Sequence, residues 1–466
     1  MPHEYKIASM PGDGIGPEVI DAALDVLDAV ARYSGEFTLS FDNLLWGSDF
    51  YKATGTYLPS DGLETLKKYD AVLFGAVGAP DVPDSVSLWE LLLTMRGSLQ
   101  QYANVRPVKC LSSIEPVSRH VRPRDIDWMF VRENSEGEYA GQGGRTHSGF
   151  GWEVATEVAI FTRHGVRRIM RFAFETAASR PRKLLTVVTK SNAQRYGLVL
   201  WDEIAEEVSK EFPDVKWDKM LVDAMTVRMV RNPQSLDTIV GTNLHIDILS
   251  DLAAALAGSV GIAASANIDP TRKSPSMFEP VHGSAFDITG KGIANPLGAI
   301  WSSAMMLEWL GEKQGSMLVM NAIEKACAEG NTTGDLGGKL NTKQCSEACF
   351  GSVSVLANPV RAYATGTTNV FPQFAEYGDF DNDLGLVNFE GGSLVMNVCS
   401  SRDNKHGHHS TTEVIGTKGR ILVNGEPRIL PVDISDEHGT RYLDQLDHMD
   451  HTDMFLPTFK AELARF

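Results

Sequence analysis

The hydrophobic pattern of the first part of the chain alternates between short apolar runs and longer amphipathic stretches. The short runs predict buried strands at 6–10, 70–74, 128–131 and 183–189. Between them, apolar residues recur at helical spacing after Pro17, at Ile20, Ala23, Leu24, Leu27 and Val30, and a further helix is predicted over about 191–210. Strands that alternate with helices in this way are typical of an α/β architecture.

The pattern changes near residue 350. Beyond it, short strand-like runs with frequent Gly, Asn and Asp occur at 360–363, 385–389, 393–399, 412–415 and 420–423. They predict a mostly antiparallel sheet. We therefore expect a boundary at 345–358, with one domain over 1–350 and a second over 358–466.

Composition limits the classes of function and the compartment. The net charge of −17 argues against general nucleic-acid binding, because phosphate contacts need clustered Lys and Arg. The five cysteines are scattered and form no CxxC pair, which favours a reducing compartment over a zinc site or a disulfide framework. No signal-peptide core or membrane-spanning run is found, so a cytoplasmic protein without a membrane partner is expected.

Three arginines are candidate site residues: Arg96 ends an apolar helical segment, Arg106 lies in NVRP and Arg132 follows a predicted strand. Guanidinium groups bind carboxylates through paired hydrogen bonds, so a dicarboxylate site needs several of them. The alternative is that each one is a surface charge or a salt-bridge partner.

Asp247 and Asp251 lie four residues apart and share one face of a predicted helix. Two carboxylates placed so closely would hold a hard divalent ion such as Mg²⁺ or Mn²⁺, and Asp223, after another strand-like run, would add a third ligand. Helix capping and a solvated helix face remain the alternative.

Two candidate proton-transfer groups are Lys190, at the end of the strand LLTVVT, and Tyr139, in RENSEGEY. A lysine near other cations can have a lowered pKa and act as a base, and the tyrosine would be the matching acid. A structural role for each is the alternative.

The segment FEPVHGSAFDITGKGIANP is rich in turn-forming residues. Free backbone amides at Gly283 and Ala285 and a donor at His282 would suit a phosphate, and Asp287 would bind ribose hydroxyls and select NAD over NADP. The alternative is an ordinary surface loop. The earlier GDGIG lacks the G-x-G-x-x-G spacing, so no Rossmann domain is predicted there.

Together and in this order, these segments resemble the isocitrate/isopropylmalate dehydrogenase family over about residues 5–350. The motifs are MPGDGIGPEV, MRGSLQQYANVRP, VRENSEGEY, TKSN, VDAM, DILSDLAAALAGSVGIAASANI, EPVHGSAFDITGKGIANP and DLGG. The segments GAVGAPDVPDSVSLWELL, SRPRK and WDK are most similar to the tartrate and D-malate dehydrogenase branch of that family.

The resemblance implies a two-domain α/β fold that works as a homodimer with shared active sites. Arg96, Arg106 and Arg132 would bind a small dicarboxylate. Asp247 and Asp251 would hold Mn²⁺ or Mg²⁺, with Asp223 and the base Lys190 from the second subunit, and Tyr139 would protonate the enol. The residues implied for NAD are Ile15, His282, Gly283, Ala285, Asp287 and Asn295.

The helix before Arg96 bears on substrate choice. Leu92 and its neighbour Leu93 offer no polar group for a third carboxylate, and Trp89 would fill the hollow that an isopropyl group needs. The sequence also departs from the family at His245-Ile246, where an aromatic–Gly pair usually precedes the first metal aspartate. A β-branched residue there, or competition by His245, would weaken the metal site.

Residues from about 358 onward resemble the C-terminal sheet domain of the glucose–fructose oxidoreductase/inositol 2-dehydrogenase family. No nucleotide-binding half precedes this part, so it is predicted to be a partial α+β sheet domain without catalysis of its own. Its role stays open between oligomer contacts and a fusion of neighbouring genes. The segment NKHGHHS, with His406, His408 and His409, is predicted to be a hairpin loop rather than a metal site.

The sequence therefore predicts an NAD- and metal-dependent oxidation of tartrate or D-malate, with decarboxylation. A 3-isopropylmalate dehydrogenase is the alternative within the family. A catalytically weak binding or assembly protein is the alternative of another class.

Overall fold

The computed structural model describes residues 2–111, 114, 116–117, 122 and 125–355, and the stretches 359–367, 382–389, 395–403, 407–416, 419–425, 432–436 and 439–443. These residues belong to two compact units, Met1–Val353 and Ser354–Phe466, which are described separately.

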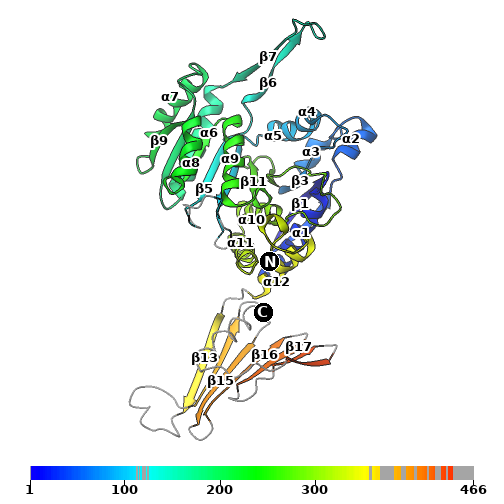
Figure 1. Cartoon of the computed structure of the whole chain (residues 1–466), viewed down its shortest axis with the longest axis vertical. Coiled ribbons are helices and arrows are strands. Elements are labelled where there is room, and N and C mark those ends of the chain that lie inside the picture. The colour runs from blue at the N-terminus through cyan, green and yellow to red at the C-terminus, as the bar shows by residue number, and fades with distance from the viewer. Residues whose placement is uncertain are drawn as a thin grey trace. The chain divides into compact units, whose positions relative to one another are not determined.

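A ten-stranded mixed sheet is the centre of the first unit, in the order β2-β1-β3-β12-β11-β4-β5-β10-β8-β9 (Figure 1). The strands are β1 (His3–Gly12), β2 (Phe37–Asn43), β3 (Ala71–Ala76), β4 (Ala103–Lys109), β5 (Asp127–Glu133), β8 (Leu184–Thr189), β9 (Lys216–Leu221), β10 (Thr238–Gly241), β11 (Ala264–Ile268) and β12 (Ser276–Pro280). Neighbours are parallel at both ends of the sheet, and β12, β11, β4 and β5 run antiparallel to one another in the middle. The predicted α/β fold class is confirmed.

Helices cover the sheet and follow the strands along the chain. They are α1 (Gly16–Ser34), α2 (Ser48–Thr54), α3 (Gly62–Leu66), α4 (Asp84–Ser87), the π-helix η1 (Leu88–Leu93), α5 (Thr94–Ser98), α6 (Arg163–Ser179), α7 (Gly197–Ser209), α8 (Val222–Arg231), α9 (Asn243–Ala257), α10 (Leu297–Leu310), α11 (Lys313–Ala328) and α12 (Thr342–Val355). Short 3-10 turns are η2 (Pro233–Ser235), η3 (Val260–Ile262) and η4 (Gly334–Leu336).

The apolar pattern explains these elements. All six residues of β3 are buried, as expected for a strand covered on both faces. Helix α1 has Pro17 in its first turn and ends at Gly35 in the left-handed conformation, and it buries Ile20, Ala23, Leu27 and Val30.

The predicted helix over 191–210 begins later than expected. Helix α7 starts at Gly197, and turns occupy the preceding residues, where the carbonyl of Lys190 accepts hydrogen bonds from the amides of Ala193 and Gln194. A local turn therefore satisfies the backbone groups that a continuous helix would have used.

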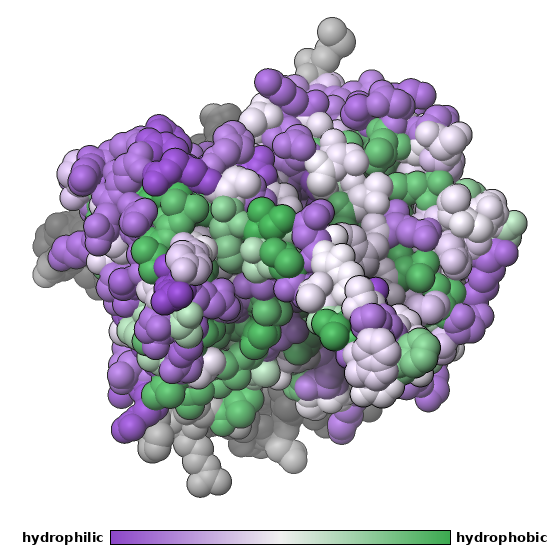
Figure 2. All heavy atoms as spheres, turned by 90° about the horizontal axis from the view of Figure 1, so that it is seen from above, coloured by the Kyte–Doolittle hydropathy of each residue, from purple (hydrophilic) through white to green (hydrophobic). Residues whose placement is uncertain are grey.

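A two-stranded arm, β6 (Gly137–Thr146) paired with β7 (Val154–Ile160), projects away from the sheet (Figure 1). Large apolar side chains on it are exposed, among them Phe150 and Trp152. The face of the molecule seen from above carries hydrophilic side chains along much of its rim and separate hydrophobic patches nearer its centre (Figure 2).

The second unit is a seven-stranded antiparallel meander in chain order from β13 to β19. The strands are β13 (Pro359–Thr367), β14 (Asn382–Phe389), β15 (Val395–Asp403), β16 (Gly407–Gly416), β17 (Gly419–Gly425), β18 (Val432–Asp436) and β19 (Gly439–Leu443). The hairpin-loop prediction is wrong for His408 and His409, which lie in β16 opposite Arg402 and Ser401, whereas His406 lies outside the described residues. Within the described chain, no helix is long and apolar enough to cross a membrane.

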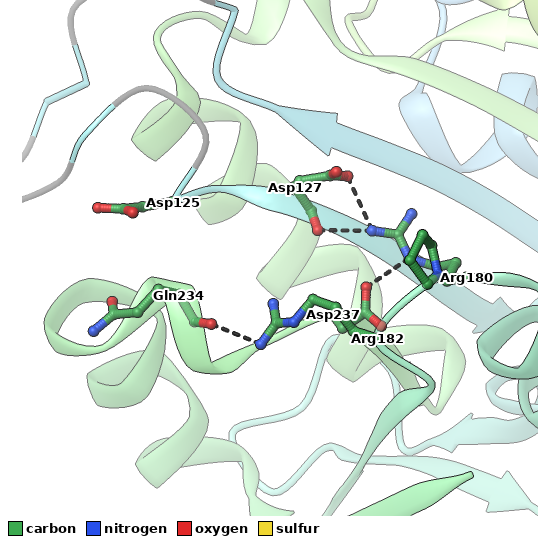
Figure 3. A pocket seen from close by; sticks show the side chains of 7 residues that line it. Asp125, Asp127, Arg180, Arg182, Gln234 and Asp237 are labelled. Carbon is green, nitrogen blue, oxygen red and sulfur yellow. Dashed lines mark hydrogen bonds and ion pairs between the residues drawn. The ribbon is translucent and has the colours of Figure 1, made fainter. Parts of the chain in front are cut away.

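A pocket of about 170 Å³ lies where β5, β8 and β10 begin, and in it Arg180 binds both Asp127 and Asp237 (Figure 3). The Arg180 Nε atom donates to Asp237 Oδ1 at 2.6 Å, and its Nη2 atom donates to the carbonyl of Asp127 at 2.8 Å. Asp237 is 1% exposed, and its second oxygen accepts a hydrogen bond from the amide of Leu184. The contacts of Arg180 in this pocket therefore join the end of α6 to the sheet. They lie at the edge where the parallel strands begin, whereas α/β proteins bind ligands at the other edge, where the strands end.

Replacement of Arg180 by Met should destabilise the first unit by about 3–5 kcal/mol, because it leaves the buried Asp237 carboxylate without its cation. All eight tryptophans lie in the first unit, so urea unfolding followed by tryptophan fluorescence reports on that unit. The control is Arg171→Met, since the exposed Arg171 pairs with Glu175 and Glu211 and should contribute below about 1 kcal/mol. Equal losses for the two variants would contradict this account of the pocket.

Candidate active site

The three predicted arginines are all buried. Arg96 lies in α5, Arg106 in β4 and Arg132 in β5, and the exposed fractions of these residues are 6%, 6% and 2%. Strands β4 and β5 are antiparallel neighbours in which Asn104 lies opposite Arg132. Arg106 is two residues from Asn104, so Arg106 and Arg132 extend from the same face of the sheet.

Asp247 accepts hydrogen bonds from several of these groups. Its Oδ1 atom accepts from Arg132 Nη1 and lies 3.3 Å from Arg106 Nη2, and its Oδ2 atom accepts from the Tyr139 hydroxyl at 3.0 Å. Asp251, one turn further along α9, lies 3.6 Å from Arg106. The structure thus brings together five of the predicted site residues, from β4, β5, β6 and α9. We call these residues, with Arg96, the arginine centre.

A chain of buried hydrogen bonds connects Arg96 to Arg106. Arg96 donates to Glu279 at 2.8 Å, and Asn267 donates to the same oxygen at 2.6 Å. Asn104 donates to Asn267 at 3.0 Å and accepts from Arg106 Nε at 2.9 Å. Sequence reasoning missed Glu279, Asn267 and Asn104, because no spacing or charge pattern indicates that strands so far apart in the chain exchange hydrogen bonds.

Burial and neighbouring charges change the pKa values in the arginine centre. Burial and the nearby Arg106 lower the pKa of Arg132 to about 10, against the opposing effect of Asp247. Burial alone would raise the pKa of Asp247, but Arg132 and Arg106 outweigh it and hold that pKa below its usual value. Burial and the Asp247 carboxylate raise the pKa of Tyr139, which keeps its phenol protonated at neutral pH. The arginine centre therefore combines three guanidinium groups, which are donors for carboxylates, with two aspartates.

Lys190 and Asp223 form a second group. Lys190 Nζ lies 2.5 Å from Asp223 Oδ1, and this hydrogen bond lowers the pKa of Asp223. Among the described residues, no hydrogen bond or ion pair joins this group to the arginine centre. Over the same part of the chain, no three His, Cys, Asp or Glu side chains are close enough together to hold a metal. Within a single chain, the predicted metal ligands therefore lie in two groups, with Asp223 in one and Asp247 and Asp251 in the other.

The loop between β12 and α10 contains most of the predicted cofactor residues and is anchored at both ends. At its start, the amide of Ile15 donates to the carbonyl of Ser284 at 2.8 Å. Gly14 is required at this contact, because a Cβ atom there would lie 1.9 Å from that carbonyl oxygen. At its end, Asn295 donates to Asp335 at 2.9 Å, and Asp335 also accepts from Ser259.

Around the first of these anchors, the loop presents groups that are free to bind a ligand. Gly283 has open space around it, and Asp287 is exposed. His282 Nδ1 donates to the carbonyl of Gly283, which leaves its buried Nε2 atom without a partner as an acceptor, and burial lowers the pKa of this imidazole. Ala285 has a φ of +41°, a strained conformation for a residue other than glycine. An unpaired buried nitrogen and a strained backbone in one loop are typical of a binding site.

Trp89 and Leu92 lie on the π-helix η1, where the sequence predicted an ordinary helix. Trp89 is 42% exposed, and its ring lies against Gly141 of the arm. Leu92 is partly buried against the apolar cluster that contains Leu91, Met95 and Leu99. π-Helices are rare and frequently occur at functional sites.

The unusual His245-Ile246 pair is accommodated in the first turn of α9. The Thr242 side chain caps this helix by accepting a hydrogen bond from the amide of His245 at 3.2 Å. Ile246 is fully buried against Gly241, and its amide donates to the carbonyl of Thr242. The backbone is helical here, so the turn before Asp247 does not require glycine.

Comparison with known proteins shows the family of this chain. The profile of the isocitrate/isopropylmalate dehydrogenase family matches residues 6–349. A protein of Agrobacterium vitis named "Probable tartrate dehydrogenase/decarboxylase" is 65% identical over 345 residues, which are 74% of this chain and 96% of that protein. The D-malate dehydrogenase [decarboxylating] of Escherichia coli (strain K12) is 46% identical over 350 residues, 74% of this chain and 97% of that protein.

Solved structures give the same assignment. The crystal structure of isocitrate dehydrogenase from Methylococcus capsulatus is similar to this chain with a TM-score of 0.69 and 36% sequence identity. The match covers 75% of this chain and 99% of that one. On the strength of its sequence, its fold and these relatives, the chain belongs to the isocitrate/isopropylmalate dehydrogenase family of oxidoreductases.

Proposed function

We propose that the first unit oxidises a small 2-hydroxy diacid, tartrate or D-malate, at C2 with NAD as the hydride acceptor, and releases one carboxylate as CO₂. The observation that carries this proposal is the convergence of three buried guanidinium groups near Asp247 and Tyr139. Guanidinium pairs suit the two carboxylates of a diacid. The names of the relatives from Agrobacterium vitis and Escherichia coli support the choice of substrate.

A divalent cation fits the acidic side chains of the site. Asp251 is well exposed, Asp247 is held ionised by its arginines, and carboxylate oxygens are the ligands that Mg²⁺ and Mn²⁺ prefer. We propose that these two residues hold the cation together with Asp223 of a second subunit. When bound, such an ion would act as a Lewis acid toward the oxygen atoms of the substrate.

NAD fits the loop between β12 and α10. We propose that the exposed Gly283 and the strained Ala285 bring backbone amides to the phosphates, while Ile15, His282 and Asn295 shape the site. The exposed carboxylate of Asp287 would accept hydrogen bonds from ribose hydroxyls and repel a 2′-phosphate, which favours NAD over NADP.

The remaining chemistry is proton transfer. In this proposal Lys190 accepts the proton of the 2-hydroxyl as C2 loses its hydride, and Tyr139 later gives a proton to C3 of the enol that decarboxylation leaves. The raised pKa of Tyr139 supports the second role, because the phenol keeps its proton at neutral pH.

We propose a homodimer with shared sites, because helix α8 offers a surface for it. Asp223, Val227 and Val230 are spaced along one face of this helix, and the two valines are 55% and 43% exposed. On α9, Ile248 is 57% exposed and lies three residues from Asp251. If these apolar surfaces pack against a second copy, Asp223 and Lys190 move toward the partner's arginine centre.

The proposed reaction is tested by following NADH formation at 340 nm with Mn²⁺ and, in turn, D-malate, the tartrates, 3-isopropylmalate and isocitrate. D-Malate or a tartrate should be turned over, and EDTA should abolish that turnover because it removes the cation. No turnover with any substrate would instead favour a binding or assembly protein.

Substitution Trp89→Ala should raise kcat/KM for 3-isopropylmalate relative to D-malate by about tenfold or more, because removal of the indole opens space for a branched side chain. The two substrates are compared under the same conditions, so a general loss of activity does not affect the ratio. An unchanged ratio, or wild-type turnover of 3-isopropylmalate alone, would contradict the role of Trp89 and favour the isopropylmalate alternative.

Two inactive variants should restore activity when they are co-expressed. In a dimer that combines Lys190→Met with Asp251→Asn, one site carries both changes and the other is intact, so about a quarter of wild-type activity should return. The control pair is Lys190→Met with Asp223→Asn, because both residues serve the partner's site and no intact site can form. Recovery in neither mixture would rule out shared sites.

A further inference from the structure

Trp89 of η1 lies directly on the backbone of the arm at Gly141. A Cβ atom at Gly141 would lie 2.6 Å from Cη2 and 2.7 Å from Cζ3 of the indole, which is closer than carbon atoms approach. Gly141 also has a φ of +67°, in the left-handed region. Both the indole and the backbone therefore require glycine at this position.

Gly141 belongs to an irregular stretch of β6 that also carries Tyr139. Between the pairs Gly137–Ile160 and Gln142–Val158, the four residues 138–141 of β6 oppose only residue 159 of β7. Bulges of this kind occur next to active sites, where they redirect a side chain. Within three residues, this stretch contacts α9 through Tyr139 and η1 through Gly141.

The other side of the contact is connected to Arg96. The carbonyl of Trp89 accepts a hydrogen bond from the Thr94 hydroxyl at 2.8 Å, which secures the end of the π-helix. The chain continues directly into α5, where Arg96 is held by Glu279. The contact between Trp89 and Gly141 thus connects the helix that holds Arg96 with the strand that holds Tyr139.

We propose that Trp89 and Gly141 form a positioning pair that sets the place of Tyr139 relative to Asp247 and Arg96. The expected effect on kcat rests on the proposed function, whereas the expected effect on stability rests only on the contact between Trp89 and Gly141. Trp89 narrows the substrate site only because Gly141 lets the edge of the indole reach the backbone of the arm. A side chain at position 141 would force the indole and the arm apart and move the Tyr139 hydroxyl away from Asp247.

The pair is tested with Gly141→Ala, Trp89→Leu and the double variant, using the diacid that the wild type turns over. Gly141→Ala should lower kcat by about tenfold or more, since displacement of a catalytic group by around 1 Å can cost on the order of 10²-fold. Trp89→Leu in the same chain should recover most of that loss, because the shorter side chain leaves room for the added methyl group.

Gly149→Ala is the matched control. Gly149 lies in the turn of the same arm with a φ of +85° and has nothing within 4 Å of the added Cβ atom. It carries the same backbone strain without the indole contact, and its kcat should stay within about twofold of wild type. A Gly141→Ala variant that behaves like Gly149→Ala, or that Trp89→Leu fails to rescue, would overturn the proposal.

Stability provides a second measurement that does not depend on activity. Thermal unfolding of the wild type, the two single variants and the double variant is followed by tryptophan fluorescence. The decrease in melting temperature caused by Gly141→Ala should be smaller in the Trp89→Leu background than in the wild type. If the wild type oxidises no diacid, the proposed function fails, and this coupling still decides whether the pair exists. Additive losses would overturn the pair even if the enzyme is active.

Discussion

The guanidinium groups of Arg96, Arg106 and Arg132 are withdrawn from water at one place in the sheet, and the surrounding structure has to compensate for that burial. An unpaired buried charge costs several kcal/mol. Asp247 compensates two of the three cations, and Glu279 compensates the third. The amides of Asn104 and Asn267 form the hydrogen bonds that connect Arg106 with Glu279. The antiparallel middle of the sheet, the start of α9 and the end of β12 are all positioned by these contacts.

The same constraint prepares the site for its ligand. The same guanidinium groups are donors that pair with carboxylates, and the low pKa of Asp247 keeps a carboxylate available at the centre. Glu279 lies in β12, directly before the loop proposed for NAD, so Arg96 and that loop are held by one strand. The contact between Trp89 and Gly141 brings the arm, with Tyr139, to the same centre. In the proposed reaction, substrate, cofactor and proton donor would thus be arranged around one buried ionic network.

Local patterns in the sequence predicted what depends on local chemistry. Apolar runs located β1, β3, β5 and β8, and helical spacing placed Asp247 and Asp251 on one face of α9. The late start of α7 and the π-helix at Trp89 were missed. The spacing of apolar residues reveals neither the hydrogen bonds of a turn nor the wider hydrogen-bond pattern of a π-helix. Asn104, Asn267 and Gly141 were missed for a different reason. Their roles depend on neighbours far away in the chain. The sequence around each residue does not reveal which distant element packs or pairs with it. The predicted loop at His408 and His409 failed similarly, since pairing with β15 extends the strand through a polar segment.

The most direct test of the arginine centre is whether a diacid and a divalent cation stabilise each other in it. The measurement is the shift in melting temperature of the first unit, followed by tryptophan fluorescence, with Mn²⁺, with D-malate or a tartrate, and with both together. If both bind at one centre, the shift with both should exceed the sum of the separate shifts, and Asp251→Asn should remove the excess. Separate shifts that simply add, or an excess that persists in Asp251→Asn, would contradict a common site at the arginine centre.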